Sequence, residues 1–140
     1  MASRRKGRIL AFQALYSWDL QYSQRGDVSI PPDLLEFTWA AKPDEGIMDF
    51  SRLLLTGAVE NIREIDKVIG RHLENWEIDR LNRVDLAVLR MSVYTLMFQK
   101  ETHPAIVIDE AIDISKEFGT DDSYRFVNGV LDSIRKTLEG

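Results

Sequence analysis

Hydrophobic residues recur at three- and four-residue spacing along most of the chain. This is the repeat of an α-helix that buries one face, and no stretch shows the strict apolar and polar alternation of strands between hairpin turns. The pattern therefore predicts an all-α fold, a compact bundle of about seven helices. We expect helices near residues 3–22, 33–39, 44–61, 63–73, 82–99, 106–118 and from 120 onwards, with breaks at Gly26, Pro43 and Trp76 and with the third and fourth helices either separate or joined as one bent helix.

The segment 82–99 is apolar around nearly its whole circumference, and a helix of that kind packs at the centre of a bundle. Polar residues mark the starts of other helices, because Ser3 and Thr120 are both good N-caps. Asp121 and Asp122 then fall into the first turn of the last helix, where the helix dipole favours carboxylates. These positions predict where the first and last helices begin.

Two glycines carry separate expectations. Gly119 follows the segment 106–118 and suits the position that ends a helix. Gly129 lies inside the last predicted helix and costs about 1 kcal/mol relative to Ala, so we expect a neighbouring backbone to approach it closely.

The chain has 140 residues, of which 44% are hydrophobic. This is enough to bury one core and too little to require a second domain, so we expect residues 1–140 to form one domain. Cysteine is absent, which excludes disulfides and thiolate metal sites and fits a reducing compartment. No apolar run reaches membrane-spanning length, and no continuous apolar segment follows the basic N-terminus as in a signal peptide. We therefore expect a cytoplasmic protein with no membrane partner.

The pattern predicts neither a metal site nor a catalytic site. His72 and His103 fall in different predicted elements, and without cysteine their spacing does not suit zinc. Asp109 and Asp113 lie one helical turn apart with Glu110 beside them, but such carboxylates more often form a solvated helix face than an acid–base pair. Phosphate-binding glycine loops and nucleophile-elbow serines are missing. We predict a protein that is not an enzyme and has no cofactor.

The net charge is −5, yet positive charge is concentrated near the N-terminus. Without Arg4, Arg5, Lys6 and Arg8 the chain carries 14 basic and 23 acidic residues. Cations at a helix N-terminus oppose the helix dipole at a cost of about 0.3–1 kcal/mol each, so a group outside the helix should compensate them. Arg4 and Arg8 are one turn apart with Arg5 beside them, which suits contacts with successive phosphates. From charge alone, an RNA-binding surface and a solvated helix end are equally good interpretations.

Aromatic residues supply base stacking, the second feature of single-stranded RNA recognition. Tyr16 lies on the apolar stripe of the first helix, where a core position is the more common interpretation. Phe126 lies off the stripe of the last helix, next to Arg125 and close to Asn128. Phe126 is therefore the better candidate for stacking on a base.

Several motifs, in order along the chain, match a single family. They are Arg4-Arg5-Lys6-Gly7-Arg8 with Ala14-Leu15-Tyr16, the stretch 83–94, Ile108-Asp109-Glu110-Ala111, and Phe126-Val127-Asn128-Gly129-Val130-Leu131-Asp132. Together they resemble the NusB family of bacterial antitermination factors, and the likeness runs from the first helix to the last. The resemblance implies two three-helix groups packed together. One departure is Gly7, which stands where the family usually has Ala, so we expect the basic segment to be frayed until it binds.

What the resemblance implies about function is binding of BoxA RNA in nascent ribosomal RNA transcripts, together with a small ribosomal-subunit protein called NusE. That pair would join NusA, NusG and RNA polymerase and prevent premature termination. By motif, the expected RNA-binding residues are Arg4, Arg5, Arg8, Tyr16, Asp122, Arg125, Phe126 and Asn128. The expected partner-binding residues are Asp85, Tyr94 and Glu110.

Two other interpretations stay open. The first is the NusB-like domain of a ribosomal RNA methyltransferase, which the length of the chain disfavours because no cofactor-binding segment follows. The second is a protein-interaction adaptor whose basic end only keeps it in solution. A homodimer is also possible, and it could cover the arginine surface expected to bind RNA.

Overall fold

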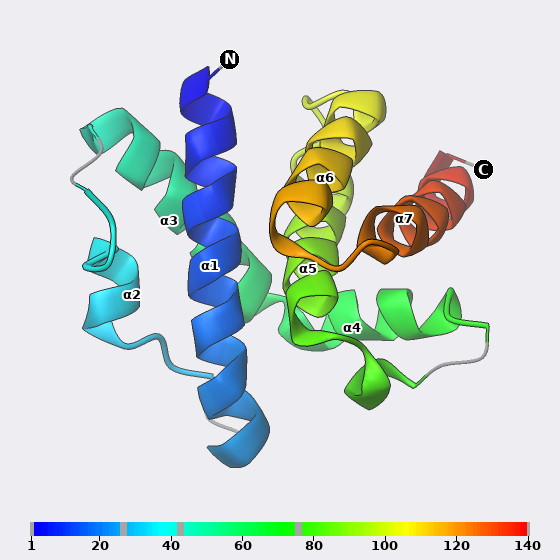
Figure 1. Ribbon diagram of the computed structural model, residues 1–140, viewed down its shortest axis with the longest axis horizontal. Coiled ribbons are helices and arrows are strands. Elements are labelled where there is room, and N and C mark those ends of the chain that lie inside the picture. The colour runs from blue at the N-terminus through cyan, green and yellow to red at the C-terminus, as the bar shows by residue number, and fades with distance from the viewer. Residues whose placement is uncertain (1, 26–27, 42–43, 75–76, 140) are drawn as a thin grey trace.

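The computed structural model describes residues 2–25, 28–41, 44–74 and 77–139, and within these residues it contains helices and no strands (Figure 1). The positions Gly26, Pro43 and Trp76, where we expected breaks, lie outside the described residues. The all-α fold predicted from the sequence is confirmed. The α-helices are α1 (Ala2–Arg25), α2 (Pro32–Glu36), α3 (Glu45–Glu60), α4 (Ile62–Arg71), α5 (Arg83–Phe98), α6 (Pro104–Phe118) and α7 (Ser123–Glu139), and the 3₁₀ helix η1 is Ile78–Arg80.

Helix α5 lies at the centre of the bundle, as its apolar circumference predicted. All residues from 85 to 96 are buried, and α5 packs against α1, α3, α4, α6 and α7. In Figure 1, α1, α2 and α3 lie to the left of α5, α6 overlaps the upper part of α5, α7 lies to its right and α4 extends from its lower end; α1 packs on α2 and α3, and α5, α6 and α7 pack on one another. The two groups expected from the resemblance are thus α1–α3 and α5–α7.

Helices α1 and α2 depart from their predicted ends, whereas α3 and α4 follow one of the two expected alternatives. Helix α1 begins at Ala2, so Ser3 is a helical residue and not the N-cap. Helix α2 ends at Glu36 and not near Trp39, because Phe37 adopts the left-handed conformation with φ 52°. Helices α3 and α4 are separate and meet at Asn61, whose Nδ2 donates to the Gly57 carbonyl at 2.8 Å.

Helix α6 starts two residues before the predicted position. Pro104 occupies its first turn, where the missing N–H costs no helical hydrogen bond, and Nδ1 of His103 accepts from the Ala105 N–H at 3.1 Å. Gly119 ends the helix as predicted, and its N–H donates to the Ser115 carbonyl at 2.9 Å.

Helix α7 starts later than predicted, at Ser123. Thr120 is therefore not its N-cap; instead the Thr120 N–H donates to Oγ of Ser123 at 2.9 Å. Asp121 and Asp122 lie in the turn before α7 and not in its first helical turn. The prediction failed because the Ser123 hydroxyl accepts from the Thr120 N–H, and such local side-chain hydrogen bonds compete with helical backbone hydrogen bonds near helix ends.

Gly7 and Gly129 both differ from their expected roles. Gly7 is a buried residue within α1, and a Cβ there would lie 2.6 Å from Cδ2 of Phe50. Its carbonyl accepts from Oγ of Ser51 at 2.9 Å, so Gly7 allows α1 to approach α3, and the frayed helix that we expected is absent. A Cβ on Gly129 would meet no atom within 4 Å, so the expected close backbone is absent there.

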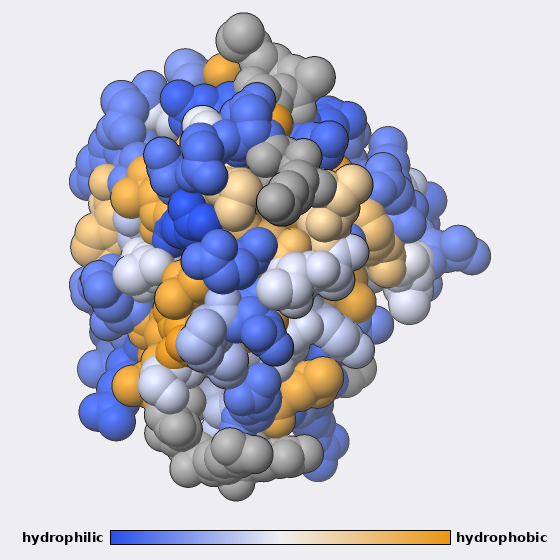
Figure 2. Space-filling view, turned by 90° about the vertical axis from the view of Figure 1, so that its left-hand side faces the viewer, coloured by the Kyte–Doolittle hydropathy of each residue, from blue (hydrophilic) through white to orange (hydrophobic). Residues whose placement is uncertain are grey.

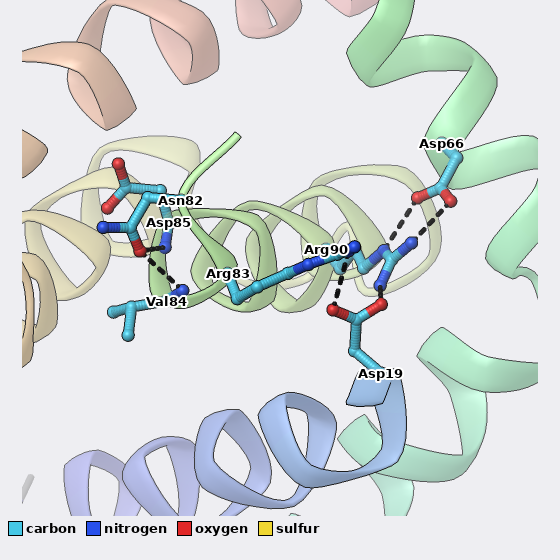
Figure 3. Close-up of polar contacts among 7 residues, drawn as sticks. All are labelled: Asp19, Asp66, Asn82, Arg83, Val84, Asp85 and Arg90. Atoms are coloured by element: carbon cyan, nitrogen blue, oxygen red, sulfur yellow. Dashed lines mark hydrogen bonds and ion pairs between the residues drawn. The ribbon is translucent and has the colours of Figure 1, made fainter. Parts of the chain in front are cut away.

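A buried group of charges joins α1, α4 and α5 (Figure 3). Arg90 donates to Asp19 at 2.8 Å from Nη1 and to Asp66 at 2.9 Å from Nε and 2.8 Å from Nη2. Asp19 is 1% exposed and also accepts from Nη1 of Arg83 at 3.0 Å. Burial lowers the pKa of Arg90, but the hydrogen bonds to Asp66 and Asp19 outweigh it and the pKa is raised. The pairing keeps α1 in a defined register against the central helix.

Hydrophobic and hydrophilic side chains alternate on the surface that Figure 2 shows. On the face that carries α2 and α3, hydrophobic patches are separated by hydrophilic side chains (Figure 2). Within the described part of the chain, no helix is both long and apolar enough to cross a membrane.

Candidate nucleic-acid interface

Arg4 differs in its contacts from the other two arginines that we expected to bind RNA. It is exposed on the first turn of α1, and its guanidinium carbon lies 4.4 Å from the centre of the Phe50 ring on α3. A cation above an aromatic face is attracted to it, which fixes the side chain without neutralising its charge. Among the described residues Arg4 forms no ion pair within 4.0 Å, so its charge is available to an anion.

Arg5 and Arg8 are paired with carboxylates of α6. Nη2 of Arg5 lies 2.6 Å from Oε2 of Glu110 and also contacts Asp113, and Nη1 of Arg8 lies 3.2 Å from Oε1 of Glu110. The hydrogen bond to Glu110 is the main cause of a raised pKa at Arg5. Burial is the main cause of a lowered pKa at Arg8, which Glu110 opposes. The compensating group predicted for these cations is therefore inside the protein.

The residues expected on the last helix lie around its first turns. Asp122, Arg125 and Asn128 are exposed, whereas Phe126 is half-buried and packs against the core. Phe126 lines a hollow between α7 and the end of α4, whose other lining residues are His72, Leu73, Glu74, Arg125, Gly129, Val130 and Ser133. Gly129 also lines this hollow, and a Cβ there would meet no atom within 4 Å.

Lys116 is a basic residue beside this surface that the sequence interpretation missed. Its Nζ lies 5.0 Å from the centre of the Tyr124 ring, and the guanidinium carbon of Arg125 lies 5.5 Å from the same ring. The phenol oxygen of Tyr124 also accepts from Nε of Arg125 at 3.1 Å. The Tyr124 ring therefore holds two cations, those of Lys116 and Arg125, near the start of α7. In the sequence, the only indication of this cluster was a lysine in the last turn of the preceding helix.

Tyr16 lies half-buried in an apolar groove between α1 and the end of α6. Phe12 and Phe118 meet at the floor of this region with ring centres 5.3 Å apart. Trp39 forms another wall, and its Nε1 donates to Oε1 of Gln13 at 2.9 Å. The groove exposes aromatic surface further along the helix that carries the arginines.

Helix α6 separates the two parts of the candidate interface. It lies between α1 and α7 (Figure 1), contacts α1 through Glu110 and Phe118, and packs against α7. The arginines of α1 and the exposed residues of α7 therefore flank one helix. A strand that contacts both parts has to cross α6.

Two of the residues expected to bind a partner are buried. Asp85 is 7% exposed and hydrogen-bonded to Ser123; burial raises the pKa of its carboxyl group, and its Oδ1 has no hydrogen-bond partner among the described residues. Tyr94 is 6% exposed, its ring fills the space above Gly57, and its hydroxyl accepts from Nε2 of Gln99 at 3.2 Å. Only Glu110 reaches the surface, with 15% of its side chain exposed.

Comparison with known proteins gives a consistent answer. The model of the NusB family matches residues 5–136. Transcription antitermination protein NusB of Treponema denticola is 55% identical over 136 residues, covering 94% of this chain and 95% of the relative. The solved structure of NusB from T. maritima has a TM-score of 0.82 at 39% identity and covers 95% of this chain and 90% of that one. A structure described as antitermination factors NusB and NusE in complex with double-stranded RNA has a TM-score of 0.81 at 33% identity, with 98% of both chains covered. These matches confirm the resemblance, and the chain belongs to the NusB family.

Proposed function

We propose that this NusB-family chain is a transcription antitermination factor. It binds BoxA RNA in nascent ribosomal RNA transcripts together with a NusE-like ribosomal protein, and with NusA and NusG it joins RNA polymerase. Its relatives carry the name transcription antitermination protein, and one structural neighbour was solved with NusE and RNA. Residues 1–140 act as one domain in the cytoplasm, where transcripts are made.

The observation that carries this proposal is the position of the exposed cations. The chain is acidic overall, yet it carries exposed cations at Arg4 and Arg5 on α1, at Lys116 in the last turn of α6 and at Arg125 on α7. A local basic surface on an acidic protein favours a defined RNA strand over general attraction to nucleic acid.

Each part of the interface has a distinct role in the proposal. Arg4, Arg5 and Arg8 bind the RNA backbone, because guanidinium groups donate in the geometry that phosphate oxygens accept. Phe126 and Tyr16 offer ring surface to unstacked bases, while Asp122, Arg125 and Asn128 supply hydrogen bonds beside them.

The partner contact is assigned to Glu110, Asp85 and Tyr94. Glu110 is the residue of this set that a partner can touch directly, since Asp85 and Tyr94 are buried. Those two act from the interior, Asp85 by fixing the start of α7 through Ser123 and Tyr94 by spacing α5 from α3.

The proposal assigns no catalysis to the chain. The carboxylates of Glu110 and Asp113 both contact Arg5, so their oxygens serve ion pairs between α6 and α1. The methyltransferase alternative is disfavoured because relatives at 50–55% identity are named transcription antitermination protein NusB.

The test is a titration with a single-stranded BoxA RNA, a duplex of the same sequence and a scrambled single strand, each with and without the NusE-like protein. We expect the single-stranded BoxA RNA to bind best and the partner to tighten its binding. Equal affinity for all three RNAs would contradict BoxA recognition. Binding of the partner without any RNA binding would favour the adaptor interpretation.

A further inference from the structure

The arginines assigned to the RNA backbone are not all free to bind it. Glu110 and Asp113 on α6, here called the acidic pair, already occupy Arg5, and Glu110 also occupies Arg8. Nη2 of Arg5 donates to both carboxylates, while the two oxygens of Glu110 are divided between Arg5 and Arg8. These contacts engage Nη2 of Arg5 and Nη1 of Arg8, so a phosphate at either guanidinium uses the remaining N–H groups beside the carboxylates or displaces the carboxylates.

Carboxylates and phosphates bind guanidinium groups through the same charge-assisted hydrogen bonds. An RNA phosphate that contacts Arg5 or Arg8 therefore has to replace a carboxylate oxygen or share the arginine with it. In either case two anions approach one another, because the acidic pair stays attached to α6. The acidic pair must thus reduce the affinity of this surface for RNA.

The Arg5–Asp113 and Arg8–Glu110 ion pairs differ in how accessible they are to a competing phosphate. Arg5 and Asp113 have 48% and 45% of their side chains exposed, so solvent and phosphate reach this pair directly. Arg8 and Glu110 have 10% and 15% exposed, so their pair is sheltered beneath it. From these exposures we expect phosphate to displace Asp113 from Arg5 first. Displacing Glu110 from Arg8 should require a second interaction that binds the Glu110 carboxylate.

We propose that the acidic pair competes with RNA phosphate for Arg5 and Arg8, and that a cationic side chain of the ribosomal partner relieves this competition by binding Glu110. The proposal rests on the proposed function, because it needs RNA and partner to meet at neighbouring surfaces. A partner cation at Glu110 neutralises the carboxylate and frees the arginines for phosphate. Since binding free energies are linked, RNA at Arg8 in turn leaves Glu110 available to the partner, so each ligand strengthens the other.

Removing the charge of either member of the acidic pair should increase RNA affinity in the absence of the partner. For Asp113→Asn we expect an increase of about two- to fivefold, the range of an exposed ion pair. Glu110→Gln should increase it at least as much, because Glu110 contacts two arginines. Glu110→Gln should also reduce the factor by which the partner improves RNA binding.

The chain offers matched controls on the same helix. Asp109 and Glu117 are exposed on α6, and no ion pair with an α1 arginine is formed by either within the described residues. Asp109→Asn and Glu117→Gln make the same changes in net charge as Asp113→Asn and Glu110→Gln. They therefore report the general gain from removing negative charge, against which the two test variants are compared.

The experiment measures BoxA RNA affinity of all four variants with and without the NusE-like protein, and the salt concentration at which each elutes from phosphocellulose. The proposal requires tighter RNA binding and later elution for the test variants than for their controls, with a smaller partner effect in Glu110→Gln. Equal behaviour of test and control variants would overturn it, and an unchanged partner effect would overturn the coupling. If the unsubstituted protein binds no BoxA RNA at all, the proposed function fails, and elution from phosphocellulose alone decides whether the acidic pair competes with phosphate.

Discussion

Arg90 at the centre of α5 donates from Nη1 to Oδ1 of Asp19 on α1 at 2.8 Å, in a place where both side chains are at most 5% exposed. The arginine is shared with Asp66 of α4, so one cation connects three helices. Because α1 also carries the arginines of the candidate interface, this buried contact contributes to holding their helix against α5.

Asp19→Ala should destabilise the fold by about 3 kcal/mol, since removing one partner leaves Arg90 buried with only Asp66 to neutralise it. Asp132→Ala is the control, because Asp132 pairs with Arg135 and Lys136 on the exposed side of α7 and its removal should destabilise the fold much less. Urea unfolding of both variants measures the difference. Similar losses would show that the buried contact contributes little more than an exposed one.

Gly57→Ala and Gly129→Ala should change stability in opposite directions. A Cβ on Gly57 would lie 2.2 Å from Cζ of Tyr94, and overpacking of this kind costs about 1–3 kcal/mol. A Cβ on Gly129 would meet nothing within 4 Å, so the better helix propensity of Ala should add up to about 1 kcal/mol. Thermal unfolding measures both; a destabilised Gly129→Ala would contradict the open space over α7.

Asp85 should make part of the stability depend on pH. Burial raises the pKa of its carboxyl group in the folded state, so above that pKa folding carries the cost of a buried charge. The cost is relieved as the pH falls through the raised pKa. As the pH is lowered from neutral to about 4, the free energy of unfolding of the unsubstituted protein should therefore rise relative to that of Asp85→Asn. A difference between the two that does not vary with pH would contradict this assignment.

Much of the fold follows from features that are local in sequence. The apolar circumference of 82–99 placed α5 at the centre, and Gly119 marked the end of α6. What could not be predicted depends on atoms that meet only in the folded chain. Asp19 and Arg90 are 71 residues apart, and the left-handed conformation that ends α2 falls on Phe37, a residue type with no preference for it.

The candidate site was predictable as a set of residue types but not in its electrostatics. Arg4, Arg5 and Arg8 stand together as their spacing required. Periodicity shows that a helix carries acidic residues, yet it does not show which partner they face. The carboxylates of Glu110 and Asp113 were therefore interpreted as a solvated face, although they neutralise two of the arginines.

Phe126→Leu should weaken binding of BoxA RNA by about 1–3 kcal/mol if a base stacks on the ring, because Leu keeps most of the packing against the core and lacks the aromatic face. Phe98→Leu changes an aromatic residue that is 41% exposed at the end of α5, and it should leave RNA binding without partner unchanged. Titrations at one salt concentration compare the two. Equal affinity of Phe126→Leu and the unsubstituted protein would assign Phe126 to packing alone.

The most direct test of the RNA surface on α1 is the salt dependence of BoxA RNA binding by Arg4→Ala. Arg4 is exposed and has no carboxylate partner among the described residues, so its removal should cost little stability. The control is Arg63→Ala, which removes an exposed arginine from α4. If Arg4 contacts a phosphate of a single strand, the slope of log affinity against log salt should become shallower by about 0.7 in Arg4→Ala and stay unchanged in Arg63→Ala. Identical slopes for the two variants would contradict the assignment of the α1 arginines to the RNA backbone.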